Sequence, residues 1–178
     1  MYPETAAGRP APGRPRVPPR HAPRGGIVVA GAHGGAGVTT LAALLRPAWD
    51  MGVVGPPGQG RGPLRTGGRP VVLVTRGTVA ASGRAVTAVS ALGGQGVPVA
   101  VLAVTGDGLP EPGEARYRFR LLEARVGAVV RVPYIPALRV ADDPLRVDLP
   151  RRARRALAEI WSLAGLPQVP GSASVTRP

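Results

Sequence analysis

The clearest chemistry in this chain belongs to a glycine-rich segment in its first quarter. The segment contains, in order, Gly31, Ala32, His33, Gly34, Gly35, Ala36, Gly37, Val38, Thr39 and Thr40. The glycines at 34, 35 and 37 permit positive φ angles and close backbone approach, so successive N–H groups can converge on a phosphate. Thr39 stands where a hydroxyl group would coordinate Mg²⁺. The pattern therefore predicts a phosphate-binding turn.

Alternating strand-like and helix-like segments surround this turn. The runs at 71–75 and 97–105 are almost continuously apolar, which is typical of strands buried on both faces of a parallel sheet. Shorter runs at 27–30 and 128–132 complete the expected strands, and the expected helices span 39–46, 79–92, 114–126 and 149–164. The alternation predicts an α/β domain with a mainly parallel sheet of four or five strands flanked by helices. The turn would join the first strand to the first helix, where such a sheet binds its ligand and the helix dipole favours an anion.

Glycine and proline mark the boundaries of this domain. Residues 1–25 hold seven Pro and five Arg but almost no large apolar side chain, so they are predicted to form a disordered tail, and 167–178 form another. Residues 46–70 contain twelve Gly or Pro and are interpreted as a long loop, which inside a domain is usually functional or disordered. The expected organisation is a single α/β domain over 26–166.

Composition excludes several classes of protein. The net charge is +13, and all 23 basic residues apart from His are arginine. Lys, Asn and Cys are absent, which points to a GC-rich genome and means that part of the charge reflects mutational drift. Without Cys or Lys the chain has no disulfide scaffold, thiolate nucleophile or Schiff base. No apolar run approaches the ~18 residues of a membrane span, and the N-terminus lacks the apolar region of a signal peptide, so we expect a cytoplasmic protein without a transmembrane segment.

The glycine-rich segment resembles the deviant Walker A motif of the ParA/MinD family of P-loop ATPases, whose pattern is x-K-G-G-x-G-K-[ST]-[ST]. The matching residues are Gly34, Gly35, Gly37, Thr39 and Thr40. Both lysines of the family are replaced, the signature lysine by His33 and the phosphate-gripping lysine by Val38. The runs at 71–75 and 97–105 and the segment Arg131-Val-Pro133-Tyr134 are similar to later parts of the family, although only the turn is a specific motif.

This resemblance implies a P-loop fold that binds ATP or GTP with Mg²⁺. The implied nucleotide contacts are His33, Gly34, Gly35, Ala36, Gly37, Val38, Thr39, Thr40, Asp107 and Pro133, with Thr39 also on the metal ion. The resemblance further implies a homodimer, or a heterodimer with a related ATPase, with a role in positioning DNA, plasmids or secretion machinery.

The chain departs from the family at its catalytic groups. The run at 71–75 continues into Arg76 and Gly77 where the family has an Asp, and Asp50 is the only acid of the 46–70 segment. The family's base-reading Asn is also missing, and Asp107 stands in that region instead. Because phosphoryl transfer depends on positioned cations and dipoles, we expect weak or no hydrolysis and no catalytic residues, as in a pseudo-ATPase. The alternative is an ATPase that a partner's Arg or Lys activates.

Three side chains near these motifs admit two interpretations each. His33 either donates to a phosphate or occupies an exposed turn. Asp50 is either a displaced metal ligand or a loop residue. Asp107 either accepts a hydrogen bond from a purine amine or is an ordinary turn residue.

Four arginines form a cluster at the start of the last expected helix: Arg151, Arg152, Arg154 and Arg155. Cations are mildly unfavourable at a helix N-terminus, so their presence points to an acidic protein, DNA or an anionic membrane, unless they simply form a solvated surface. The cluster supports a second hypothesis, in which the chain binds no nucleotide. It would then be a scaffold or interaction protein that docks an acidic partner through this helix and the N-terminal tail.

Overall fold

Five parallel strands form a single sheet at the centre of the protein. The computed structural model describes residues 25–55 and 63–165. Its strands are β1 (Ile27–Gly31), β2 (Ala48–Val53), β3 (Val71–Arg76), β4 (Val99–Thr105) and β5 (Ala128–Val132). They lie in the order β2-β1-β3-β4-β5, and each neighbouring pair is parallel. The predicted α/β fold with a mainly parallel sheet is therefore confirmed.

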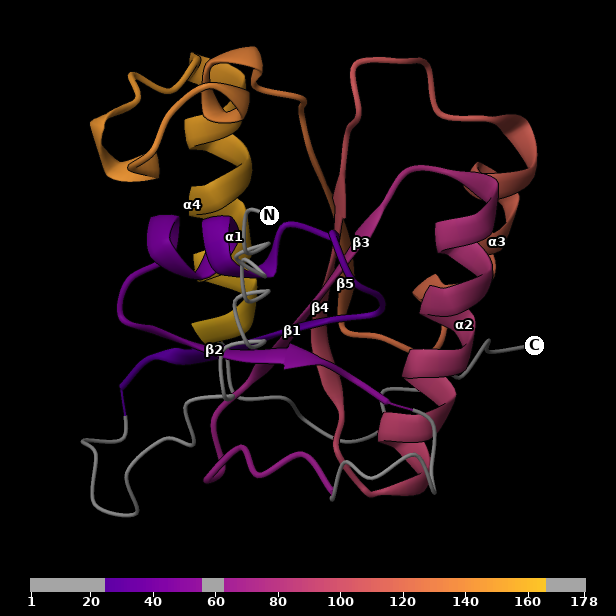
Figure 1. Ribbon diagram of the computed structural model, residues 1–178. Coiled ribbons are helices and arrows are strands. Elements are labelled where there is room, and N and C mark those ends of the chain that lie inside the picture. The colour runs from indigo at the N-terminus through magenta and orange to yellow at the C-terminus, as the bar shows by residue number, and fades with distance from the viewer. Residues whose placement is uncertain (1–24, 56–62, 166–178) are drawn as a thin grey trace, which may run out of the picture.

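Two pairs of helices cover the two faces of the sheet (Figure 1). One face carries α1 (Val38–Leu44) and α4 (Arg151–Gly165), and the other carries α2 (Val79–Gly94) and α3 (Gly113–Glu123). Two 3-10 turns, η1 (Pro136–Arg139) and η2 (Pro144–Arg146), connect β5 to α4. No helix in the described ranges has the length and apolar character needed to cross a membrane. From β1 the strand order continues to β2 at one edge of the sheet, and from β3 it continues to β4 and β5 at the other edge. A doubly wound sheet binds its ligand where the order reverses, which is here the crevice between the carboxyl ends of β1 and β3.

The apolar residues of the inner strands supply both hydrophobic cores. Ile27 and Val29 of β1 belong to the core beneath α1 and α4, while Val28 and Ala30 belong to the core beneath α2 and α3. All five residues of β1 are buried. Burial on both faces explains why these strands are continuous apolar runs instead of alternating ones.

Residues 48–53, which the sequence pattern placed in a long loop, form the edge strand β2. They pair with β1, and Asp50 lies opposite Val29. The strand includes Asp50 and Gly52 and is mostly only partly buried, so it lacks the apolar run that marks the inner strands. The described remainder of 46–70 contains no further helix or strand, whereas 56–62 and nearly all of the two predicted tails lie outside the described residues.

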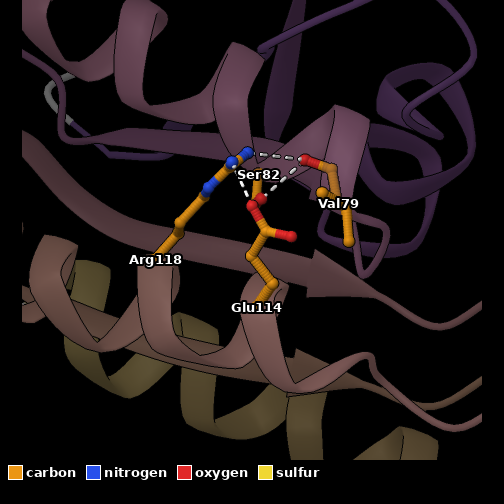
Figure 2. Close-up of polar contacts among 4 residues, drawn as sticks. All are labelled: Val79, Ser82, Glu114 and Arg118. Atoms are coloured by element: carbon orange, nitrogen blue, oxygen red, sulfur yellow. Dashed lines mark hydrogen bonds and ion pairs between the residues drawn. The ribbon is translucent and has the colours of Figure 1, made fainter.

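An arginine of α3 joins this helix to α2 (Figure 2). Arg118 Nη1 donates to the Val79 carbonyl at the start of α2 over 3.1 Å, and Nη2 pairs with Glu114 one turn earlier in α3. Ser82 Oγ donates to the same Val79 carbonyl at 2.7 Å. Because α2 begins only three residues after β3 ends, these bonds also hold the segment that follows Arg76.

Candidate functional site

The glycine-rich turn joins β1 to α1 at the carboxyl edge of the sheet, as predicted. Gly35 and Gly37 have φ angles of +75° and +95°, which residues with side chains disfavour, so the backbone requires glycine at both positions. A Cβ at Gly34, Gly35 or Gly37 would have no heavy atom within 4 Å. The outer surface of the turn is therefore open to a ligand.

Val38, at the position of the missing lysine, belongs to the hydrophobic core. Its side chain is 8% exposed and lies in the same core cluster as Ile27 and Leu41. It packs so closely on the end of β1 that a Cβ at Gly31 would lie 2.6 Å from Val38 Cγ2. The side chain therefore points away from the turn, and only the Val38 backbone remains available to a ligand.

Three side chains hold consecutive carbonyl groups of the turn. His33 Nδ1 donates to the Gly34 carbonyl at 2.9 Å, and Arg76 Nε donates to the Gly35 carbonyl at 2.8 Å. Thr105 Oγ1 lies 3.2 Å from the Ala36 carbonyl and 3.1 Å from the Thr75 carbonyl, so its single proton is shared between these two acceptors. Arg76 ends β3 and Thr105 ends β4. The ends of two neighbouring strands thus fix the shape of a turn that follows a third.

His33 is a buried anchor of this turn. Its side chain is 8% exposed, so the prediction that it occupies an exposed turn is wrong. Nε2 accepts the backbone N–H of Arg76 at 3.3 Å, while Nδ1 faces a carbonyl, so the imidazole carries its proton on Nδ1. Both nitrogens are engaged, and a direct bond to a phosphate would require one of them to be released.

The backbone N–H groups of the turn face away from the anchored carbonyls, because the two groups of a trans peptide point in opposite directions. Within the part of the chain that the structure describes, the N–H groups of residues 34–37 donate to no other residue. Three of these four residues are exposed glycines. Consecutive unpaired N–H groups of this kind are the donors of anion-binding loops.

Thr39 and Asp50 meet beside the turn. Thr39 Oγ1 donates to Asp50 Oδ2 at 2.7 Å, and Asp50 Oδ1 accepts the Gly52 N–H at 2.8 Å. Pairing of β2 with β1 brings the carboxylate to the start of α1, so the interpretation of Asp50 as a loop residue is wrong. Its role as a displaced metal ligand stays a prediction.

The oxygens of this pair suit Mg²⁺, which prefers carboxylate and hydroxyl ligands together with phosphate oxygens. The described residues contain no group of three or more His, Cys, Asp or Glu side chains that could hold a metal ion. A divalent cation at Thr39 and Asp50 would therefore need further oxygens from a ligand such as a phosphate.

A pocket of about 350 Å³ opens beside the turn at the same edge of the sheet. One part of its wall combines residues that end or follow four strands: Ala36, Gly37, Arg76, Thr105, Gly106, Asp107, Pro133 and Tyr134. Leucines of α1 and α4, with Ile135 and Leu138, make the rest of the wall apolar. This volume and this mixture of surfaces are typical of a small-molecule site.

Asp107 and Pro133, both predicted to lie near a base, line this pocket together with Thr40. Asp107 Oδ1 accepts the Leu109 N–H at 3.0 Å, as expected of a turn residue, and its contact with a base stays a prediction. The flanking glycines let Tyr134 approach, because a Cβ at the first of them, Gly106, would lie 2.9 Å from the Tyr134 nitrogen. Asp107 and Tyr134 thus lie close together in the wall of this pocket.

A second pocket of about 410 Å³ lies across Asp107 and Tyr134 from the first. Arg131 and Glu111 line it, and Arg131 Nε donates to Glu111 Oε2 at 2.7 Å. This hydrogen bond raises the pKa of the Arg131 guanidinium above its ordinary value, although burial acts in the opposite direction. The ion pair holds the Arg131 guanidinium beside Glu111 in the wall of this pocket.

The predicted arginine cluster occupies the first turns of α4. Its members, Arg151, Arg152, Arg154 and Arg155, are all exposed. Arg154 pairs with Asp148 at 3.3 Å, and Arg152 lines the second pocket. The cluster therefore lies near the candidate site without forming part of the first pocket.

Arg76, Thr105 and Tyr134 are the site residues that sequence reasoning did not assign. Arg76 and Thr105 are the last residues of β3 and β4. The carboxyl ends of parallel strands share one edge of the sheet, where the ligand binds. Arg76 and Thr105 could therefore have been recognised as site residues from their positions at the ends of apolar runs. Tyr134 follows Pro133 in the segment already compared with the family.

Comparisons with protein-family models, curated proteins and solved structures found no match to this chain. The resemblance to ParA/MinD ATPases therefore depends on the residues quoted above and stays a prediction.

Proposed function

We propose that this protein binds a nucleoside di- or triphosphate, ATP or GTP, together with Mg²⁺, hydrolyses it weakly or not at all, and acts through partners. The observation that carries this proposal is the row of N–H groups at 34–37, unpaired among the residues that the structure describes, beside a pocket with a partly apolar wall. Phosphate oxygens accept hydrogen bonds from such donors, and a purine ring suits an apolar pocket of this size. The resemblance to ParA/MinD ATPases extends the proposal to a cytoplasmic role in positioning DNA or secretion machinery.

The residues present fit a bound Mg²⁺ only when phosphate accompanies it. Thr39 and Asp50 would hold the ion, whose contribution is to neutralise phosphate charge. Asp107, which lines the pocket, would accept a hydrogen bond from a purine amine. An acceptor alone does not choose between adenine and guanine, which is why both nucleotides remain in the proposal.

Weak hydrolysis follows from the groups beside the turn. Val38 contributes no cation, because its side chain lies in the core. The two carboxylates nearest the turn already accept hydrogen bonds, Asp50 from Thr39 and Gly52, and Asp107 from Leu109. Positioned cations and a water-orienting group supply most of the catalysis of phosphoryl transfer, so their loss leaves binding with little chemistry.

Titration of the full chain with ATP and GTP, with and without Mg²⁺, tests the proposal. Thermal unfolding and calorimetry should show binding that Asp50→Asn and Thr39→Val weaken about tenfold in Mg²⁺, equivalent to about 1.4 kcal/mol. Thr87→Val is the matched control, because the Thr87 hydroxyl bonds within α2 on the far face of the sheet. Absence of any thermal shift or heat at millimolar nucleotide would refute the proposal.

A second candidate function is docking of an acidic protein or DNA on α4. The observation that favours it is the exposure of all four arginines of the cluster while Ala153, Leu157 and Ile160 face the core. Replacing the four arginines with Ala should then abolish binding of a DNA duplex or an acidic peptide. Gly37→Glu, which would block the phosphate site, should leave that binding unchanged. Equal binding by the arginine variant and the wild type would exclude this function.

A further inference from the structure

Position 38 carries no cation, yet an arginine from another strand reaches the same turn. Arg76 Nε lies 2.8 Å from the Gly35 carbonyl, and the Arg76 side chain lines the first pocket next to Ala36 and Gly37. The arginine arrives from the end of β3, which pairs with β1 on the side opposite β2. Arg76 and Asp50 therefore come from strands on opposite sides of β1.

The backbone of Arg76 is fixed at both ends of the residue. Its N–H donates to His33 Nε2, and the following Gly77 N–H donates to the Thr105 carbonyl at 3.0 Å. The Nε bond to Gly35 then directs the side chain along the turn. A guanidinium held in this way loses less conformational freedom when it binds a further group.

The outer end of the Arg76 side chain is available. Among residues 25–55 and 63–165, neither Nη atom of Arg76 hydrogen-bonds to another residue, and no ion pair forms with it. The residue is exposed and lies at the rim of the pocket. Arg139, the other cation lining this pocket, lies on η1 and makes no bond to the turn.

We infer that Arg76 is a phosphate-binding residue that supplies, from β3, the positive charge that Val38 does not supply from the turn. The two Nη groups would donate to oxygens of the phosphate chain of a nucleotide, and this chain would extend from the pocket to the N–H groups of residues 34–37. Arginine is suited to this task because its planar fork donates two parallel hydrogen bonds. This inference rests on the proposed nucleotide function and names the group that recognises the phosphates.

The competing explanation is that Arg76 only braces the Gly35 carbonyl. The two explanations differ in which ligands lose affinity when the charge is removed. A phosphate contact affects ADP, ATP and inorganic tripolyphosphate but leaves adenosine unchanged. A brace affects adenosine and ADP alike, because it shapes the turn and the pocket as a whole.

The experiment measures affinities of the full chain for adenosine, ADP, ATP and tripolyphosphate by calorimetry without Mg²⁺. Arg76→Ala should weaken ADP and tripolyphosphate about ten- to a hundredfold, the range for a hydrogen bond to a charged group, and change adenosine less than about twofold. Arg76→Gln retains a donor for the Gly35 carbonyl without the charge, and it should show the same selective loss. It also keeps the test decisive should Arg76→Ala fail to fold.

Arg84→Ala is the matched control, since Arg84 is an exposed arginine of α2 on the other face of the sheet. Wild-type affinity for ADP in both Arg76 variants would overturn the inference while the proposed function stands. Equal losses for adenosine and ADP would show a brace and also overturn it. No binding of any of these ligands, or of GDP and GTP, by the wild type, with or without added Mg²⁺, would overturn the proposed function and the inference together.

Discussion

Replacing Gly31 with Ala is expected to destabilise this protein through one contact, with Val38. The new Cβ would lie 2.6 Å from Val38 Cγ2 and 3.1 Å from the His33 carbonyl oxygen. Carbon atoms do not approach to 2.6 Å, so the end of β1 or the start of α1 must move. Overpacking of this kind costs about 1–3 kcal/mol, and we expect about 2 kcal/mol here.

Val38→Ala has a similar cost for the opposite reason. It removes two carbons from a side chain that is 8% exposed, which loses about 1.6 kcal/mol at ~0.8 kcal/mol per carbon, and about 2 kcal/mol with the cavity included. In the double variant the new Cβ at position 31 occupies space that Val38 Cγ2 leaves. The double variant should therefore be about 2 kcal/mol less stable than the wild type, whereas additive effects would give about 4 kcal/mol.

Equilibrium unfolding in urea, followed by circular dichroism, measures the three free energies of unfolding. Gly34→Ala is the matched control, because Gly34 has no positive φ and a Cβ there meets no heavy atom within 4 Å. Its expected effect is within about 0.5 kcal/mol. Additive effects of Gly31→Ala and Val38→Ala would refute the packing of Val38 against β1, and with it the explanation for the apolar residue at position 38.

Three further substitutions test the turn and the helix contact. Gly37→Ala forces a side chain into a φ of +95° and should cost about 1–2 kcal/mol; an unchanged unfolding free energy would mean that the turn has a different conformation. Thr105→Val removes the donor to the Ala36 carbonyl and should cost about 1 kcal/mol and weaken nucleotide binding; unchanged values for both would contradict the anchoring. Arg118→Ala removes the donor to the Val79 carbonyl and should cost about 1 kcal/mol and speed hydrogen exchange at the start of α2; unchanged exchange there would show that Arg118 does not join the helices.

Exposed residues of α2 provide controls for these variants. Thr87→Val removes a hydroxyl whose bond lies within its own helix, and Arg84→Ala removes an arginine from the surface of that helix. Both should leave nucleotide affinity unchanged. A loss of affinity in either control would mean that the affinity effect at Thr105 reflects general destabilisation.

The inner strands and the position of the turn could be predicted from the sequence alone. Apolar runs predicted strands where β1, β3 and β4 are observed, because a strand buried on both faces has no polar position to interrupt the run. The shorter run at 128–132 predicted the edge strand β5. The turn followed from the glycines, since Gly35 and Gly37 adopt φ angles that few other residues tolerate. Both signals are local, so neighbouring residues suffice to reveal them.

The contacts that build the candidate site depend on the tertiary structure instead. Asp50 reaches Thr39 only because 48–53 pair with β1, and no apolar pattern in that segment announces the pairing. Arg76 reaches Gly35 only because β3 lies beside β1, and its sequence position shows merely that a strand has ended. The sequence by itself determined where the four helices and the strands β1, β3, β4 and β5 lie, although not the edge strand β2, and that Val38 is apolar. The tertiary structure decided which strands become neighbours, and therefore which distant side chains meet at the turn. The order of the strands depends on how the helices bury both faces of the sheet, which no local sequence pattern specifies.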